Sequence, residues 1–219
     1  MIRFEEIQKN KEINAYIEQG DVVMRALGFT EHSFAHATKV AKTASGLLKQ
    51  LGFDDETCNL AAIAGYMHDI GNTANRNDHA QTGAIMAFSI LRTLGMDPKH
   101  TACIVSAIGN HDESSCFPPD AVGAALVLAD KSDIRRSRVR NRNKTNFDIH
   151  DRVNYAATQS ELQLNDREKT ITLQIQIDTE TASTIEYFEI FLQRMLLCQK
   201  AADKLGLKFR LQINGHSMI

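Results

Sequence analysis

The sequence predicts a mainly helical protein, with a helical bundle over residues 1–145 followed by a small α+β domain over residues 146–219. Two observations support this division. In the first part, apolar residues recur every three or four positions in successive segments, which is the period of a helix that buries one face. In the second part, two segments alternate between apolar and polar residues, which is the period of a β-strand.

Residues that cap or end helices mark the segments of the bundle. Asp54 and Asp78 stand where a side-chain oxygen can accept from the free N–H groups at a helix start. Asp97-Pro98 combines such a cap with a proline at the first helical position. Helices are expected over residues 1–27 with a break near Gly20, 31–51, 54–69, 78–94, 97–111 and 120–130.

The C-terminal part is expected to form a β-β-α-β domain. Asn165-Asp166 provides a turn between the two alternating segments, and a long helix and a final strand follow. The elements are expected over residues 149–157 (helix), 160–164 and 170–177 (strands), 179–205 (helix) and 208–213 (strand). This domain contains no recognisable catalytic constellation, and a role in oligomerisation or ligand sensing is left open.

Composition and charge exclude several classes of protein. Hydrophobic residues make up 43% of the chain and charged residues 24%, which is ordinary for a folded globular protein. The 25 basic and 27 acidic residues give a net charge of -2, so nucleic acid is not an expected partner. The N-terminus is charged and no apolar run approaches the ~20 residues of a membrane span, so we expect a cytoplasmic protein without a membrane partner.

The four cysteines are scattered and have no metal-type spacing. We expect them to be reduced and mostly structural, with Cys116 exposed in a loop.

Six potential metal ligands occur at corresponding places in successive helices. Each lies near the inward end of an apolar stripe, or at the corner where such a stripe ends. A carboxylate on a buried stripe must be paired or bound to metal, because burying an isolated charge costs many kcal/mol. The residues are His36, His68, Asp69, His79, His111 and Asp130. Nitrogen and oxygen ligands without thiolate suit one or two divalent ions of iron or manganese, with zinc, nickel or cobalt as alternatives.

The remaining histidines are expected to lie outside this set. His32 precedes His36 by about one helical turn and is rotated a further ~40° away from the buried stripe. His100, His150 and His216 have no place on an inward face. We interpret these three as surface or structural residues.

Seven basic residues occur within residues 131–144, directly after Asp130. A solvated linker is one interpretation of such a run. In the other, some of these cations bind a substrate phosphate near the metals. The candidates are Lys131 and one or two of Arg135, Arg136 and Arg138. The run has no interleaved aromatic residues, which a surface for nucleic acid would use.

Two short motifs accompany the ligands, His-Asp-Ile-Gly at residues 68–71 and Ala-Asp-Lys at residues 129–131. Gly71 is expected to end the helix that precedes it. Together with the order of the ligands, the two motifs resemble the HD superfamily of metal-dependent phosphohydrolases over residues 30–140. The two further histidines before the last aspartate resemble the binuclear members, such as cyclic-di-GMP phosphodiesterases and diadenosine tetraphosphate hydrolases. Asn72 stands where the cyclic-di-GMP enzymes usually have lysine, so that substrate is not assigned.

The resemblance implies a helical HD-domain bundle and a role for each residue. By resemblance, the ligands of one ion would be His36, His68 and Asp130, and those of the other His79 and His111, with Asp69 bridging both. Two ions ~3.5–4 Å apart lower the pKa of a bridging water, and the resulting hydroxide attacks phosphorus. Lys131 and, after it, Arg138 would neutralise charge on the phosphoryl oxygens. Asp69 and Lys131 are therefore the predicted catalytic residues.

The predicted function is hydrolysis of a phosphate ester or anhydride, with a small phosphorylated molecule such as a nucleotide as substrate. A diiron oxygenase is an alternative, because some HD-superfamily proteins activate oxygen with a diiron pair. A third interpretation is a non-catalytic sensor that binds a nucleotide between the two domains. The complete ligand set favours catalysis over sensing, and homodimer formation is left open.

Overall fold

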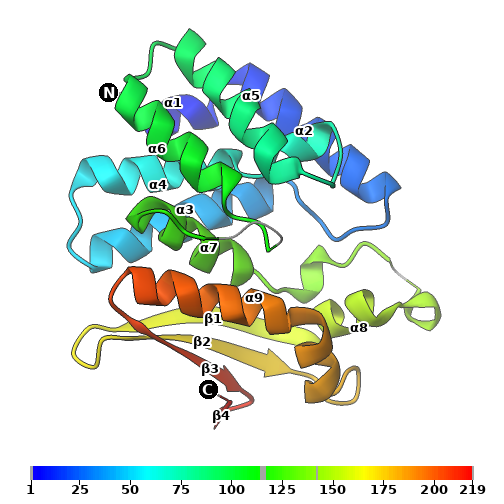
Figure 1. The fold of residues 1–219 in the computed structure, drawn as a ribbon. Helices are drawn as coiled ribbons and strands as arrows, with labels where there is room; N and C mark the ends of the chain where they lie inside the picture. The colour runs from blue at the N-terminus through cyan, green and yellow to red at the C-terminus, as the bar shows by residue number, and fades with distance from the viewer. Residues whose placement is uncertain (1, 114–116, 142, 219) are drawn as a thin grey trace.

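Helices form in each segment that the apolar periodicity marks, and they pack as a bundle beside a small sheet (Figure 1). The computed structural model describes residues 2–113, 117–141 and 143–218. The bundle contains α1 (Phe4–Gln8), α2 (Lys11–Ala26), α3 (Phe34–Gln50), α4 (Asp55–Met67), the 3-10 helix η1 (Ile70–Thr73), α5 (His79–Thr93), α6 (Pro98–Gly109) and α7 (Ala121–Lys131). The 3-10 helices η2 (Arg136–Arg138) and η3 (Lys144–Asn146) then lead to α8 (Ile149–Ala156).

The C-terminal part has the predicted β-β-α-β order with one additional short strand. Its elements are β1 (Ala157–Asn165), β2 (Thr170–Ile177), α9 (Thr184–Lys204), β3 (Lys208–Ile213) and β4 (His216–Ser217). β2 and β3 are parallel because α9 forms the crossover between them, whereas β1 and β4 pair antiparallel with their neighbours. The mainly helical fold class with a small α+β part is therefore confirmed, and the boundary at residue 145 stays a prediction.

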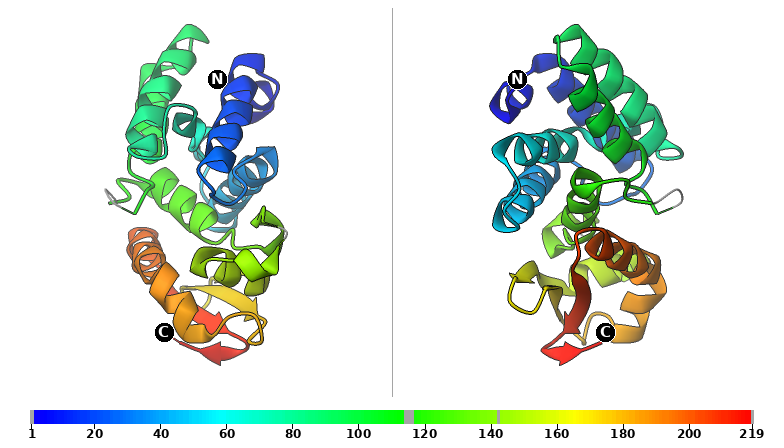
Figure 2. Two further views of the ribbon diagram at one scale, coloured as in Figure 1. Left: turned by 90° about the vertical axis from the view of Figure 1, so that its right-hand side faces the viewer. Right: turned by 60° about the vertical axis from the view of Figure 1, so that its left-hand side comes forward.

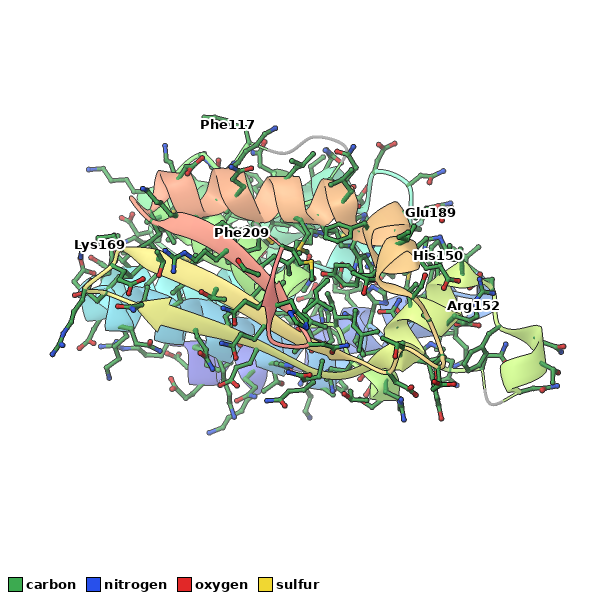
Figure 3. All side chains as sticks on the ribbon, turned by 90° about the horizontal axis from the view of Figure 1, so that it is seen from below. Phe117, His150, Arg152, Lys169, Glu189 and Phe209 are labelled. Carbon is green, nitrogen blue, oxygen red and sulfur yellow. The ribbon has the colours of Figure 1, made fainter. Side chains whose placement is uncertain are left out.

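α9 lies between the sheet and the bundle (Figures 1 and 2). β2 and β3 turn an apolar face toward it, on which Leu173 pairs with Leu211 and both are buried. α9 also packs against α7, so the buried residues of the bundle and the sheet form one hydrophobic core. Figure 3 views the sheet from its outer side, with Lys169 at the turn between β1 and β2. α7 is consequently held from both sides, by α3 and α4 and by α9.

The predicted helix caps are present at two of the three positions. Asp54 Oδ1 accepts from Thr57 N at 2.7 Å, and Asp97 Oδ1 accepts from Lys99 N at 2.8 Å. Asp78 differs, because it has a φ of 57° in the left-handed region and its side chain makes no capping hydrogen bond to α5. Asp78 therefore provides the turn into α5 rather than its cap.

The helix break predicted near Gly20 is wrong. α2 continues through Gly20, and the break lies before it, where Asn10 Oδ1 accepts from Glu12 N and caps α2. A Cβ added at Gly20 would lie 3.5 Å from both the Cβ of Asn72 and the backbone nitrogen of Thr73. The glycine thus serves the close approach of α2 to η1.

Gly71 also has a different role from the predicted one. α4 ends at Met67, and Gly71 lies within η1. A Cβ added there would overlap the carbonyl oxygen of His79 and lie 2.5 Å from Gly83 N. The absence of a side chain therefore lets η1 touch the first turn of α5, which brings His79 close to the corner at residues 68–69.

Two further expectations concern cysteines and membranes. Cys58, Cys103 and Cys198 are free thiols, as predicted, whereas Cys116 lies outside the described residues. Within the described part of the chain, none of the helices combines the length and the apolar character that crossing a membrane requires.

Gly71→Ala is expected to lower the free energy of unfolding by more than ~2 kcal/mol, because η1 and α5 must separate to admit the methyl group. Gly46→Ala is the matched control, since Gly46 lies inside α3 and an added Cβ there meets nothing within 4 Å. This control should gain ~0.5–1 kcal/mol from helix propensity. Urea unfolding measures both values, and equal stability of the two variants would contradict the close contact at Gly71.

Candidate metal centre

The six predicted ligands meet inside the bundle. The four histidine side chains are buried and the two aspartates are mostly buried. Their positions in the chain are α3 (His36), the two residues after α4 (His68 and Asp69), the start of α5 (His79), the second residue after α6 (His111) and the last turn of α7 (Asp130). The structure therefore brings together every residue that the sequence predicts as a ligand, and their binding of metal stays a prediction.

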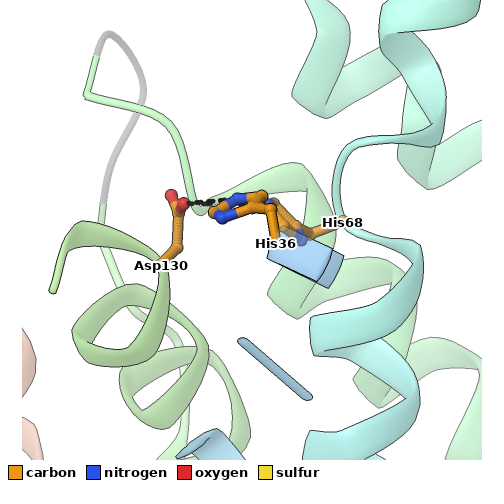
Figure 4. A group of neighbouring side chains, drawn as sticks. All are labelled: His36, His68 and Asp130. Carbon is orange, nitrogen blue, oxygen red and sulfur yellow. Dashed lines mark hydrogen bonds and ion pairs between the residues drawn. The ribbon is translucent and has the colours of Figure 1, made fainter. Parts of the chain in front are cut away.

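The first group of ligand atoms consists of His36, His68, Asp69 and Asp130. The Nε2 atoms of His36 and His68 are 3.3 Å apart. Asp130 Oδ1 lies 3.3 Å from His36 Nε2 (Figure 4). Asp69 Oδ2 lies 3.2 Å from His68 Nε2. Ligands bound to one ion at ~2.0–2.2 Å are separated by ~3.0–3.5 Å, so this spacing fits a shared ion.

The second group contains the two further histidines. His79 Nε2 lies 3.2 Å from His111 Nε2 and 3.6 Å from Asp69 Oδ1. Asp69 therefore directs one carboxylate oxygen to each group. This is the placement that the predicted bridging role requires.

The orientation of each imidazole ring is set by its Nδ1 atom. In every case Nδ1 donates to an oxygen that can only accept, so Nδ1 carries hydrogen and Nε2 faces the centre. The partners are Asp133 Oδ2 for His36 (2.8 Å), Gly65 O for His68 (2.8 Å), Arg76 O for His79 (3.0 Å) and Ile108 O for His111 (2.6 Å). Imidazole nitrogens this close repel each other unless a proton or a cation lies between them, so the donor set fits bound metal.

The charges of the ligands depend on burial and on each other. Burial alone would lower the pKa of His68, but the carboxylates of Asp69 and Asp130 outweigh it and raise the pKa to about 10. Burial and the nearby His68 lower the pKa of His111 to about 3. Burial also lowers the pKa of His79, so this histidine is neutral as well. Without metal, the ionised carboxylates of Asp69 and Asp130 thus lie beside an imidazolium at His68.

Asp133 supports the first group and was not predicted. Its buried carboxylate accepts from His36 Nδ1 and is also bonded by Lys39 Nζ at 2.8 Å and Arg135 Nε at 2.6 Å. Burial alone would raise the pKa of Asp133, but the hydrogen bonds from His36 and Arg135 hold the pKa well below its usual range. Its place three residues after Asp130, just beyond the end of α7, was the available signal.

Lys131 lies where the prediction requires it. Its buried Nζ atom is 2.9 Å from Asp130 Oδ2 and 3.6 Å from Glu113 Oε1. Burial lowers the pKa of Lys131, but Asp130 and Glu113 outweigh it and raise the pKa above its ordinary value. Lys131 is therefore a permanent cation beside the ligands.

Among the described residues, the arginines that follow Lys131 bond to other parts of the fold, which does not fit the interpretation of this run as a solvated linker. Arg135 pairs with Asp133 through two nitrogens and is not among the residues that line the cavity beside the ligands, and its role in substrate binding stays a prediction. Arg136 Nε donates to Tyr155 O at 2.6 Å. Arg138 lines the cavity, but its Nε and Nη1 atoms donate to the backbone oxygens of Glu31 and Asp133.

A cavity of about 440 Å³ opens beside the ligands. One wall carries ligands, another is the loop after α2 at residues 27–30, and a third comes from the C-terminal part. The residues of this third wall are Asp148, His150, Asp151, Asn154, Phe191 and Arg194. His150 was expected on the surface, and it is exposed on α8 while lining the cavity (Figure 3). Nothing in the sequence pattern indicated this wall, because it depends on α8 and α9 meeting the bundle.

His32 lies closer to the centre than predicted. Its ring contacts the His36 ring with centroids 5.6 Å apart, and it lines the cavity. α3 begins only after Ser33, so the helical rotation used to place His32 outward does not apply to it. Burial lowers the pKa of His32, whose Nδ1 donates to Thr30 O at 2.7 Å.

A helical bundle that gathers histidines and aspartates from successive helices is the arrangement that the resemblance to the HD superfamily predicts. No model of a protein family matches the chain. An uncharacterized protein of Methanocaldococcus jannaschii is 26% identical over 200 residues, which cover 81% of this chain and 76% of the relative. The crystal structure of a predicted HD superfamily hydrolase from an uncultured Thermotogales bacterium is 27% identical, covers 57% of this chain and 68% of its own, and has a TM-score of 0.44.

Asp133→Asn is expected to weaken metal binding by ~10–100-fold, because His36 loses the charged acceptor that orients its ring. Asp178→Asn is the matched control, since Asp178 also pairs with an arginine, Arg136, but makes no contact with a ligand. Competition against a chromogenic chelator measures the affinity. An Asp133→Asn affinity equal to that of the control would show that this carboxylate does not position His36.

Metal binding at pH 7 is expected to release about one proton for the first ion, because the ion displaces the proton that the raised pKa of His68 retains. The affinity should rise as the pH increases toward the pKa of about 10 and fall as the pH decreases. Calorimetric titration in two buffers with different ionisation enthalpies gives the number of protons. Identical heats in both buffers would contradict a protonated His68 in the metal-free centre.

Proposed function

We propose that this protein is a metal-dependent phosphohydrolase that cleaves a phosphate ester or anhydride of a small molecule, with nucleotides as the first substrates to test. One observation carries the proposal. Four imidazole Nε2 atoms and two carboxylates converge at the wall of a cavity that also holds the buried ammonium of Lys131. A metal-binding wall beside a fixed cation suits a substrate that presents negatively charged oxygens.

The two ligand groups would hold one or two divalent ions, with iron or manganese preferred by their nitrogen and oxygen donors. A divalent ion bound there supplies a water of lowered pKa and neutralises charge on phosphoryl oxygens. The chain's own part is to orient the donors. Asp133 and three backbone carbonyls hold the rings, and Asp69 directs one oxygen toward each group.

Lys131 would bind the phosphoryl group. Its ammonium is buried beside Asp130 and lines the cavity, so its charge acts with little screening by water. Its pairs with Asp130 and Glu113 hold the side chain in place before the substrate arrives. A cation fixed in advance stabilises developing negative charge without reorganising during the reaction.

The cavity suits a molecule of nucleotide size. Its volume of about 440 Å³ lies in the usual range for small-molecule sites. Phe29, which is 44% exposed, offers an aromatic face for a base, while Asp148 and Asp151 offer acceptors for sugar hydroxyls. Arg194 adds a cation from α9, held by Glu113 Oε1 at 2.8 Å.

The direct test is release of inorganic phosphate by protein purified without oxygen and loaded with manganese or ferrous iron. The substrates are nucleoside monophosphates, diphosphates and triphosphates, and simple phosphate monoesters and diesters. Metal-dependent turnover of any of them supports the proposal. Oxygen consumption without phosphate release would favour the diiron oxygenase, and nucleotide binding without turnover would favour the sensor.

Lys131→Met is expected to lower kcat for the best substrate by ~10²–10³-fold, because the phosphoryl oxygens lose their fixed cation. Bound metal should remain, since Lys131 is not one of the ligands. Lys42→Met is the matched control on the exposed side of α3. Metal analysis and phosphate release are measured on the same samples, and an unchanged kcat would exclude the proposed role of Lys131.

A further inference from the structure

Arg76 lies against the second ligand group. Its Nη1 atom is 3.2 Å from His79 Nε2 and 3.9 Å from Asp69 Oδ1. These two atoms, together with His111, are the proposed ligands of a second ion. Arg76 is among the residues that sequence reasoning missed, because it lies in the short segment between η1 and α5, where no periodicity places a side chain.

Arg76 holds the His79 ring at both nitrogens. The backbone oxygen of Arg76 accepts from His79 Nδ1 at 3.0 Å, so Nε2 is left with its lone pair. The guanidinium of Arg76 then donates to that same Nε2. A metal ion and the Arg76 N–H group therefore compete for one lone pair.

In the described part of the first ligand group, no arginine or lysine nitrogen lies against a ligand nitrogen. Among the described residues, the Nε2 atoms of His36 and His68 have each other and the carboxylates of Asp69 and Asp130 as partners. The two groups also differ in charge, since Asp130 belongs only to the first. Lys131 pairs with Asp130 through Oδ2, the carboxylate oxygen that does not face His36. A divalent ion is thus attracted to the first group, and only at the second does it meet a cation directly at a ligand nitrogen.

We propose that Arg76 is a built-in cation that controls the second metal position. The centre holds one ion tightly, and a second ion binds only when the guanidinium moves away from His79 and Asp69. The side chain has room for such a movement, because it is 25% exposed and lines the cavity. Its contacts with Asp112 (3.9 Å) and with the Phe29 ring (5.8 Å from the guanidinium carbon to the centroid) are long. The proposal rests on the metal centre described above, and it is independent of whether the centre hydrolyses phosphate.

The test is a manganese titration of metal-free protein at pH 7.5, in which electron paramagnetic resonance counts free and bound ions. Wild type should bind one ion tightly and a second at least ~10-fold more weakly. In Arg76→Gln the second ion should bind ~10-fold or more tightly than in wild type, and the spectrum of a coupled manganese pair should appear at a lower concentration. Arg92→Gln removes an exposed arginine from the far end of α5 and should behave as wild type.

Arg76→Lys guards against loss of folding in the glutamine variant, which thermal unfolding would detect. Lysine keeps the positive charge but lacks the planar guanidinium that donates to His79. The second ion should therefore bind more tightly than in wild type, but the increase should be smaller than in Arg76→Gln. Equal affinity for the second ion in wild type and both variants would overturn the control by Arg76. Failure of wild type to bind any manganese would overturn the metal centre itself, whereas failure to release phosphate would affect only the proposed function.

Discussion

Two carboxylates, Asp69 and Asp130, lie almost out of contact with water in the middle of an apolar bundle, and the rest of the structure depends on compensating their charge. Lys131 and the protonated His68 provide that compensation when no metal is present. The charge of the buried Asp133 is likewise compensated by Lys39, Arg135 and Arg138. A buried charge without a partner costs several kcal/mol. These ion pairs therefore fix the conformation of the chain from the end of α7 into the loop that follows it.

The pairing of charged side chains also positions the C-terminal part against the bundle. The basic residues after α7 bind backbone oxygens and carboxylates on both sides: Arg138 reaches Glu31, while Arg136 reaches Tyr155 and Asp178. α9 then packs on α7 and brings Arg194 to Glu113, which also faces Lys131. The α+β part is thereby a wall of the cavity, although it supplies none of the predicted ligands.

The sequence could predict the parts of this protein that depend on local periodicity. His36 and His79 lie inside helices beside apolar residues, and a stripe of helical period has only one inward direction, so both reach the centre as predicted. Asp133, Arg76 and His32 were missed because they lie just outside helices, where the side-chain direction is set by tertiary contacts. Gly20 and Gly71 were misread for a related reason: a glycine needed for close packing between two elements looks the same in one sequence as a glycine that breaks a helix.

The two ligand groups share Asp69 but are not equivalent. The first combines two carboxylates with two imidazoles, whereas the second has one shared carboxylate oxygen, two neutral imidazoles and a neighbouring guanidinium. A divalent ion bound at the first group would replace the proton of His68 and offset the charges of Asp69 and Asp130. A second ion adds two positive charges that the buried residues do not offset, so an anionic substrate that enters the cavity is the natural source of the missing negative charge. Occupation of the second position and binding of a phosphorylated molecule are thus expected to favour each other, since each supplies the charge that the other needs.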